Sequence, residues 1–265
     1  MEHVVIGLID ERSDRFAIEW AIGRARTTPA RIRLVTSLDP NGSNPEGQKR
    51  FLFEASERVR LEAGGAEVET QLADGPMLHQ LVELSATAAL VVVAYRPDPA
   101  IRNGRLPSLP VSLSARARCP VVIVPDDLQP QAGPIVVGVQ NVDPSAAVAF
   151  AADEAIRTDR MLRLVHTWKS TSLDPRADHI RAGEVLRAAA ERVRAAQPGI
   201  RLEVVLEEMA AHDGVISRSR DASLIVLGTH GIGRETGVVL GVIHLEVMVR
   251  GGVPLCVVPL TASVE

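Results

Sequence analysis

SLIVLGTHGIGRETGVVLGV, residues 223–242, decides the fold of this chain and carries its strongest functional signal. The apolar run at 224–227 predicts a buried strand. A loop follows in which two residues separate Gly228 from Gly231 and nine separate Gly231 from Gly241. A second apolar run after Gly241 predicts the start of a helix. Glycines let backbone N–H groups approach a bound group, and a helix N-terminus adds unpaired donors and a positive dipole end. The pattern therefore favours binding of a phosphate.

The chain contains two related copies of one unit. Four segments of the N-terminal half recur in the C-terminal half at offsets of 130 to 134 residues. The pairs are VVIGL (4–8) with IVVGV (135–139), RLV (33–35) with RLV (163–165), ALVVVA (89–94) with SLIVLG (223–228), and CPVVIVP (119–125) with VPLCVVP (253–259). Such steady offsets predict a duplicated domain. We place the domains at 1–126 and 134–265, joined by the polar, proline-containing linker 126–134.

Strands and helices alternate in each copy. The expected strands are 3–9, 31–38, 66–72, 89–94 and 120–124 in the first copy, and 135–139, 161–168, 201–207, 223–228 and 254–260 in the second. The helices expected in the second copy are 144–158, 176–197, 211–221 and 241–250. Near-continuous apolar strands indicate a sheet covered on both faces. The fold class predicted is therefore α/β, with two tandem, Rossmann-like, doubly wound five-stranded parallel sheets. The ligand crevice of such a sheet lies beyond the carboxyl ends of its strands.

Composition narrows the function classes. Hydrophobic residues make up 46%, charged residues 23% and aromatic residues 3%, and the formal net charge is -4. We expect a globular protein that binds no nucleic acid, since a basic patch and stacking aromatics are lacking. No apolar run reaches the roughly 18 residues of a membrane span, and MEHVVIGLID enters a strand directly, so we expect a cytoplasmic protein without membrane contact. Cys119 and Cys256 lie in apolar segments and are interpreted as small buried hydrophobes.

The repeat resembles the universal stress protein family in its tandem form, over essentially the whole chain. The segments that carry the resemblance are IVVGV (135–139), LRLVHTW (162–168), DASLIVLGTHGIG (221–233) and VPLCVVP (253–259), together with Gly241. The family's nucleotide motif, G-x2-G-x9-G-[S/T], reads here Gly228, Gly231, Gly241 and Val242. The resemblance implies a sheet of strand order 3-2-1-4-5, a frequent ability to bind ATP, and a role in stress tolerance or dormancy.

Two positions of the second copy depart from the family pattern. The Asp that usually follows the first strand in ATP-binding members is replaced by Gln140, which can still donate and accept hydrogen bonds. The hydroxyl residue after Gly241 is replaced by Val242, which keeps only its backbone N–H. Losing one such bond costs about 1–3 kcal/mol. Arg234 could offset that loss by pairing with phosphate, while Glu235 would oppose a polyanion.

The first copy departs much further. Its residues at the glycine positions are Ala94, Pro97 and Pro107, with Ser108 retained, and Ile9 replaces the usual Asp, with Asp10 one position late. The loop 96–110 holds four prolines, each without an N–H. We predict that the first domain has lost nucleotide binding and the second has partly kept it.

The predicted function is a stress-response or dormancy sensor that binds ATP, with Mg²⁺, or a related adenine nucleotide in the second domain. It would act through a homo-oligomer or a regulatory protein partner rather than as an enzyme, with slow ATP hydrolysis left open. No catalytic or metal-binding set is predicted. The predicted nucleotide-binding residues are Gly138, Val139, Gln140, His166, Gly228, Thr229, Gly231, Gly233, Arg234, Gly241, Val242 and Ile243.

Three alternatives stay beside this prediction. The chain could be a nucleotide-independent interaction module in which both sites are degenerate. The glycines 231, 233 and 237 approximate a dinucleotide fingerprint, but they follow a fourth strand rather than a first, which disfavours NAD or FAD. His166 is interpreted first as a hydrogen-bonded residue at the edge of the core, and His230 and His244 as exposed.

Overall fold

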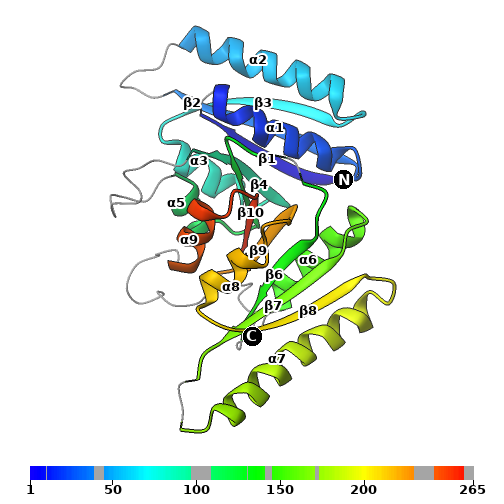
Figure 1. Ribbon diagram of the computed structural model, residues 1–265. Helices are drawn as coiled ribbons and strands as arrows, with labels where there is room; N and C mark the ends of the chain where they lie inside the picture. The colour runs from blue at the N-terminus through cyan, green and yellow to red at the C-terminus, as the bar shows by residue number, and fades with distance from the viewer. Residues whose placement is uncertain are drawn as a thin grey trace. The chain divides into compact units, whose positions relative to one another are not determined.

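A computed structural model describes residues 1–9, 11–38, 45–96, 109–129, 131–140, 145–170, 173–229 and 242–259. These residues form two compact units, the first comprising the described part of 1–128 and the second the described part of 129–259. Each unit is a layered α/β structure (Figure 1). Gly231, Gly233, Arg234 and Gly241 of the predicted site lie outside the described residues.

The first unit is a parallel sheet with helices on both faces. Its strands follow the order β3-β2-β1-β4-β5. The helices α1 and α2 pack together, as do α3 and α5. The elements in chain order are β1 (Glu2–Leu8), α1 (Glu11–Ala25), β2 (Ala30–Leu38), α2 (Pro45–Glu62), β3 (Glu67–Asp74), α3 (Met77–Leu84), β4 (Leu90–Tyr95), α5 (Leu109–Arg116) and β5 (Val121–Pro125).

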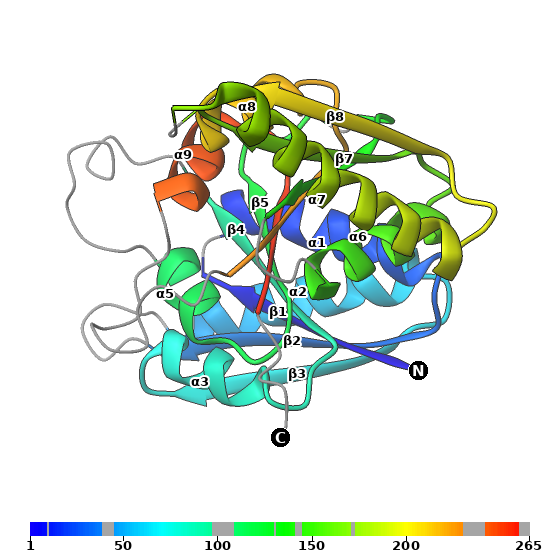
Figure 2. The same ribbon diagram turned by 90° about the horizontal axis from the view of Figure 1, so that it is seen from below.

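The second unit repeats this plan. Its parallel strands follow the order β8-β7-β6-β9-β10, with α6 and α7 side by side and α8 packed on α9 (Figure 2). The elements are β6 (Ile135–Val139), α6 (Ser145–Arg157), β7 (Leu162–Trp168), α7 (Pro175–Ala196), β8 (Leu202–Glu208), α8 (Ala211–Ser217), β9 (Leu224–Gly228), α9 (Val242–Arg250) and β10 (Leu255–Val258). The predicted fold class and strand order are confirmed.

One predicted boundary is wrong. The helix expected at 211–221 ends at Ser217. Arg163 of β7 explains the early end, because its guanidinium donates to the carbonyl of Arg218 at 2.7 Å and to the Asp221 carboxylate at 2.8 Å. The Arg218 N–H still donates to the Gly214 carbonyl, but after it the chain forms turns, and the Arg218 carbonyl bonds to the sheet instead of to a next helical turn.

The central strands are apolar because helices cover them on both faces. Every residue of β4 and β5 is buried, and so are four of the five residues of β6. Each first strand also carries a glycine at a close approach. A Cβ on Gly7 would lie 2.8 Å from Leu81 Cδ1, and one on Gly138 would lie 2.8 Å from Leu227 Cδ2. Gly138, a predicted site residue, is therefore a packing residue of the core.

Both units carry the same cross-strand ion pair. Arg33 lies opposite Glu69 in the β2–β3 register and Arg163 lies opposite Glu203 in the β7–β8 register. The shortest N–O distances are 2.6 Å and 2.7 Å. Opposite charges facing each other on neighbouring strands stabilise a specific register.

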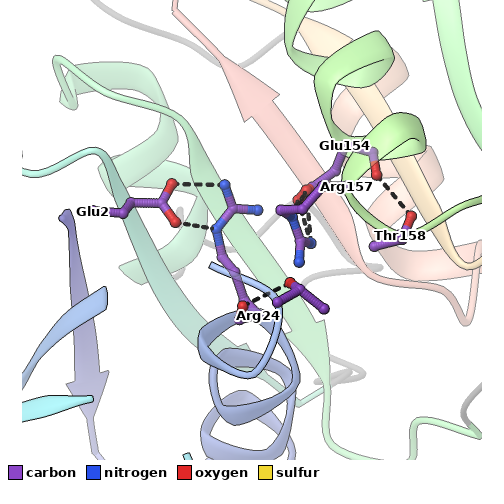
Figure 3. A network of polar contacts seen from close by, with 6 residues as sticks. Glu2, Arg24, Glu154, Arg157 and Thr158 are labelled. Atoms are coloured by element: carbon purple, nitrogen blue, oxygen red, sulfur yellow. Dashed lines mark hydrogen bonds and ion pairs between the residues drawn. The ribbon is translucent and has the colours of Figure 1, made fainter. Parts of the chain in front are cut away.

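Each unit also holds a more buried ion pair (Figure 3). In the first unit, both carboxylate oxygens of Glu2 accept from Arg24, at 2.7 and 2.8 Å, which ties the start of β1 to the end of α1. In the second unit, Glu154 and Arg157 pair within α6 at 2.6 Å, with side chains only 2% and 16% exposed.

Within the described residues, no helix is both long enough and apolar enough to cross a membrane.

Candidate functional site

The strand order of the second unit reverses between β6 and β9, which is where a doubly wound sheet opens its ligand crevice. The two strands pair in parallel with Val137 opposite Val226. Their carboxyl ends therefore lie next to each other and present Val139 and Gln140 from β6, and Gly228 and Thr229 from β9. The structure thus brings together predicted site residues that are nearly ninety positions apart in the sequence.

His166 forms a hydrogen bond with the last residue of β6. It is 4% exposed, and its Nδ1 lies 2.7 Å from the carbonyl oxygen of Val139, its partner in the β6–β7 register. A carbonyl only accepts hydrogen bonds, so Nδ1 carries the proton and donates. His166 is therefore the hydrogen-bonded residue at the edge of the core that the sequence indicates.

His244 forms the equivalent hydrogen bond with the last residue of β9. It lies in the first turn of α9, and its Nε2 is 3.1 Å from the carbonyl oxygen of Gly228. The expectation that His244 is exposed is wrong, because only 2% of it is exposed. Its contact fixes the N-terminal turn of α9 against the end of β9.

A sequence signal for the burial of His244 exists. His244 precedes the buried Val247 and Met248 by three and four positions, which places it on the apolar stripe of α9. Because histidine is polar, hydropathy alone does not assign it to that stripe.

The glycine and threonine at the end of β9 have more limited roles than the motif suggests. A Cβ on Gly228 would meet Ala147 Cβ at 3.6 Å, an ordinary contact, so no contact with the described residues requires a glycine there. The Thr229 N–H donates to the Val258 carbonyl at 2.8 Å. That amide is therefore not a donor for a ligand.

The first turn of α9 provides backbone N–H groups as hydrogen-bond donors. Val242 is its first residue and Ile243, which is half-buried, its second. The amides of a first helical turn have no acceptor within their own helix, and the helix dipole adds positive potential there. In the first unit, the second residue of α5 is Pro110, which has no N–H at all.

In the first unit, side chains of the protein itself bond to one another and to the backbone at the carboxyl ends of β1 and β4. Asp14, in the first turn of α1 and only 1% exposed, accepts a hydrogen bond from the Ile9 N–H at the end of β1. Arg96, which follows β4, donates to Ser13 at 3.0 Å and to Asp126 at 2.7 Å. The burial of Asp14 is not among the features predicted from the sequence. Its signal is again a polar residue on a buried stripe, three and four positions before Ala17 and Ile18.

No group of three or more His, Cys, Asp or Glu side chains in the described residues could hold a metal ion. The two cysteines are free and buried, as predicted. Burial raises the pKa of the Cys119 thiol to about 12, which keeps it protonated and unreactive.

The chain matches known proteins over most of its length. A family model described as the universal stress protein family matches residues 132–259. One universal stress protein of Mycobacterium tuberculosis is 30% identical over 227 residues, which cover 80% of this chain and 77% of the relative. Another from the same species is 27% identical over 270 residues and 90% of each chain.

Solved structures agree on the fold. The crystal structure of a universal stress protein from Archaeoglobus fulgidus matches with a TM-score of 0.72 at 18% identity, covering 97% of this chain and 96% of that one. A protein from Pseudomonas aeruginosa, described as functionally unknown, matches with a TM-score of 0.70 at 17% identity, covering 98% of this chain and 92% of that one. Duplicated sequence, duplicated fold and the similarity to the mycobacterial relatives lead to one conclusion: this chain is a tandem member of the universal stress protein family.

Proposed function

We propose that the second unit binds an adenine nucleotide, with ATP as the first candidate, at the carboxyl ends of β6 and β9. In this proposal the chain is a stress-response sensor without a catalytic role of its own. Binding biases a contact with another copy of the chain or with a regulatory protein.

The observation that carries the proposal is the pairing of two terminal carbonyls with two buried imidazoles. The carbonyls of Val139 and Gly228 end the two strands that flank the reversal, and they accept from His166 and His244. Unpaired carbonyls at the end of a sheet repel a polyphosphate. When both carbonyls are hydrogen-bonded to imidazoles, they repel an anion less. The positive potential and the amide donors of the α9 N-terminus then favour an anion at this corner.

The residues at that corner fit phosphate better than they fit a bare metal ion. Val242 and Ile243 supply backbone donors, and Arg234 and the glycines 231, 233 and 241 belong to the proposed cradle on the strength of the sequence motif. The described residues contain no group of three or more His, Cys, Asp or Glu side chains that could form a protein cage for Mg²⁺. In our proposal Mg²⁺ arrives with the nucleotide and is held mainly by its phosphates and water, as is usual for this ion.

We propose that the first unit binds no nucleotide. The buried Asp14 carboxylate takes up the amide at the end of β1, and Pro110 removes the amide of the second residue of α5, which is equivalent to the phosphate corner of the second unit. The full chain should therefore bind one ATP.

Isothermal titration of the full chain with ATP and Mg²⁺ tests the proposal. We expect saturable binding with one site per chain, and a loss of at least tenfold in affinity for Gly231→Pro, since proline removes an N–H and fixes the backbone of the loop. Gly104→Pro, in the corresponding loop of the first copy, is the matched control and should bind as the unchanged chain does. If ATP fails to bind at millimolar concentration, the proposal is wrong and the nucleotide-independent interaction module replaces it.

A further inference from the structure

We propose that β8 pairs with β8 of a second copy of this chain, in antiparallel orientation and with the two-fold axis at Val204. The sheet of the second unit then continues from one molecule into the next. β8 is the last strand at one end of that sheet (Figure 1). The inference names the contact between copies that the proposed function leaves open. It rests on the proposed function only for the role of the dimer, since the pairing itself needs no nucleotide.

The backbone of β8 has an outer edge that the described residues leave open. The Leu162 N–H donates to the carbonyl of Arg201, the residue before β8, at 2.8 Å. Arg201 and every second residue after it therefore direct their backbone groups to β7. The backbone groups of Leu202, Val204 and Leu206 point the other way, and no hydrogen bond within the described residues reaches them. A strand from another molecule can extend such an edge.

The equivalent edge of the first unit is closed by side chains. Arg60 of α2 donates to the Val68 carbonyl at 3.4 Å, and Gln80 of α3 donates to the Asp74 carbonyl at 3.1 Å. Val68 and Asp74 belong to the alternate residues of β3 whose carbonyls point away from β2. Two copies of one fold thus treat the same edge differently, so the open edge of β8 is not a requirement of the fold.

An exposed apolar side chain lies at the middle of the open edge. Val204 is 41% exposed, whereas Leu164, its partner in the β7–β8 register, is fully buried. Leu202 and Leu206 are half-buried and lie on the same face of β8 as Val204. Antiparallel pairing about Val204 sets Val204 against its own copy and Leu202 against Leu206 on either side. This register allows about six backbone hydrogen bonds and removes an apolar row from water.

The charges on the other face of β8 favour this register and favour a second copy as the occupant. Arg201, whose side chain is 62% exposed, lies opposite Glu207 of the second copy, and the symmetry forms this pair twice. An axis at Val205 would instead set Glu203 against Glu207 twice, and like charges facing each other destabilise paired strands. Within its own chain Glu207 also pairs with Arg218, which reduces the negative charge at the edge.

Sedimentation velocity of the full chain without nucleotide, over a dilution series, tests the inference. We expect a reversible dimer. Val204→Lys should raise its dissociation constant at least about tenfold, because two ammonium groups then face each other on the axis. Thr70→Lys is the matched control, since Thr70 is exposed and follows Glu69 in β3 as Val204 follows Glu203 in β8. It should dimerise as the unchanged chain does.

A disulfide test determines the register. In a background with Cys119→Ala and Cys256→Ala, Val204→Cys should give a linked dimer with oxidised glutathione. The Cα atoms of a hydrogen-bonded antiparallel pair are about 5.5 Å apart, which suits a disulfide. Val205→Cys should link far less, because in this register the two copies of residue 205 are offset along the strands. If Val204→Lys fails to fold, this pair of variants still decides.

The outcomes distinguish the inference from the proposed function. A chain that stays monomeric at every concentration overturns the inference, even if β8 takes up an extended peptide instead. A dimer that withstands Val204→Lys, or that Thr70→Lys dissociates, also overturns it. Linking of Val205→Cys in place of Val204→Cys contradicts the axis at Val204. A chain that dimerises through β8 but does not bind ATP contradicts only the proposed function.

Discussion

Arg163 shows how one residue can bind several elements together. Its side chain is 13% exposed and bonds to Glu203 on β8, Asp221 before β9 and the Arg218 carbonyl. The hydrogen bond from Arg163 lowers the pKa of the Asp221 carboxyl below its ordinary value. A carboxyl whose pKa is lower in the folded than in the unfolded state stabilises the fold above the unfolded pKa, and that contribution disappears as the pH falls through the folded pKa.

We therefore expect Arg163→Ala to lower the stability of the second unit at pH 7 by about 1 kcal/mol. The value is kept small because Asp221 is 63% exposed and water screens the pair. The deficit should shrink as the pH is lowered from 7 to about 3. Urea unfolding followed by Trp168 fluorescence measures it. Arg187→Ala, which breaks an exposed pair with Glu191 on α7, is the control and should change stability by less than about 0.5 kcal/mol. A deficit for Arg163→Ala that does not change with pH would contradict the linkage to Asp221.

The buried polar residues mark the limit of prediction at this scale. The position of His166 at the end of a strand was enough to predict a hydrogen-bonded residue at the edge of the core. His244 and Asp14 were not predicted, because their burial depends on which carbonyl or amide of another element faces them. Such a partner is distant in the sequence, and only the folded chain brings it close.

At the scale of the element, two glycines in helices allow the effect of helix propensity on stability to be separated from the effect of side-chain packing. Gly183 lies in α7 with nothing within 4 Å of an added Cβ, whereas a Cβ on Gly214 in α8 would lie 2.3 Å from Thr167 Cγ2. Alanine is the better helix former at both positions by about 0.8–1 kcal/mol.

We expect Gly183→Ala to stabilise the second unit by about 0.4–1 kcal/mol and Gly214→Ala to destabilise it by about 1–3 kcal/mol. The stiff side chain of a β-branched threonine explains the second sign, since it cannot easily move away from the new methyl group. Chemical denaturation of the two variants side by side checks the prediction. Equal shifts would mean that α8 moves away from β7 at little cost.

Most elements could be predicted because the apolar runs are short, continuous and repeated at a steady offset. The strand ranges observed in both units differ from the predicted ones by at most two residues at either end. The end of α8 was missed for a reason that no local pattern contains. Arg163, more than fifty positions away, takes the Arg218 carbonyl, and this contact depends on the tertiary structure.

At the scale of the whole molecule, the two cysteines report on the two units separately. Cys119 belongs to the first unit and Cys256, in β10, to the second, and both are buried. A thiol of this kind reacts only when its surroundings open. A ligand that binds one unit suppresses the opening of that unit by mass action.

We expect ATP at 100 times its dissociation constant to slow the labelling of Cys256 up to about a hundredfold and to leave the labelling of Cys119 unchanged. A thiol reagent applied to the Cys119→Ala and Cys256→Ala variants gives the two rates independently. Equal slowing of both thiols would mean that nucleotide binding is not confined to the second unit, or that the two units open together.

The arginine–glutamate pairs have a consequence for solubility. One of the two outer strands of each unit, β3 or β8, has backbone groups that a strand from another molecule could extend, which is a common route to aggregation. Glu67 and Glu69 give β3 a charged border, as Glu203 and Glu207 do for β8. The hydrogen bond from Arg33 lowers the pKa of the Glu69 carboxyl below its ordinary value, so the negative charge of Glu69 on the outer strand β3 is kept at a lower pH than that of a free glutamate. That charge opposes the addition of a strand from another molecule.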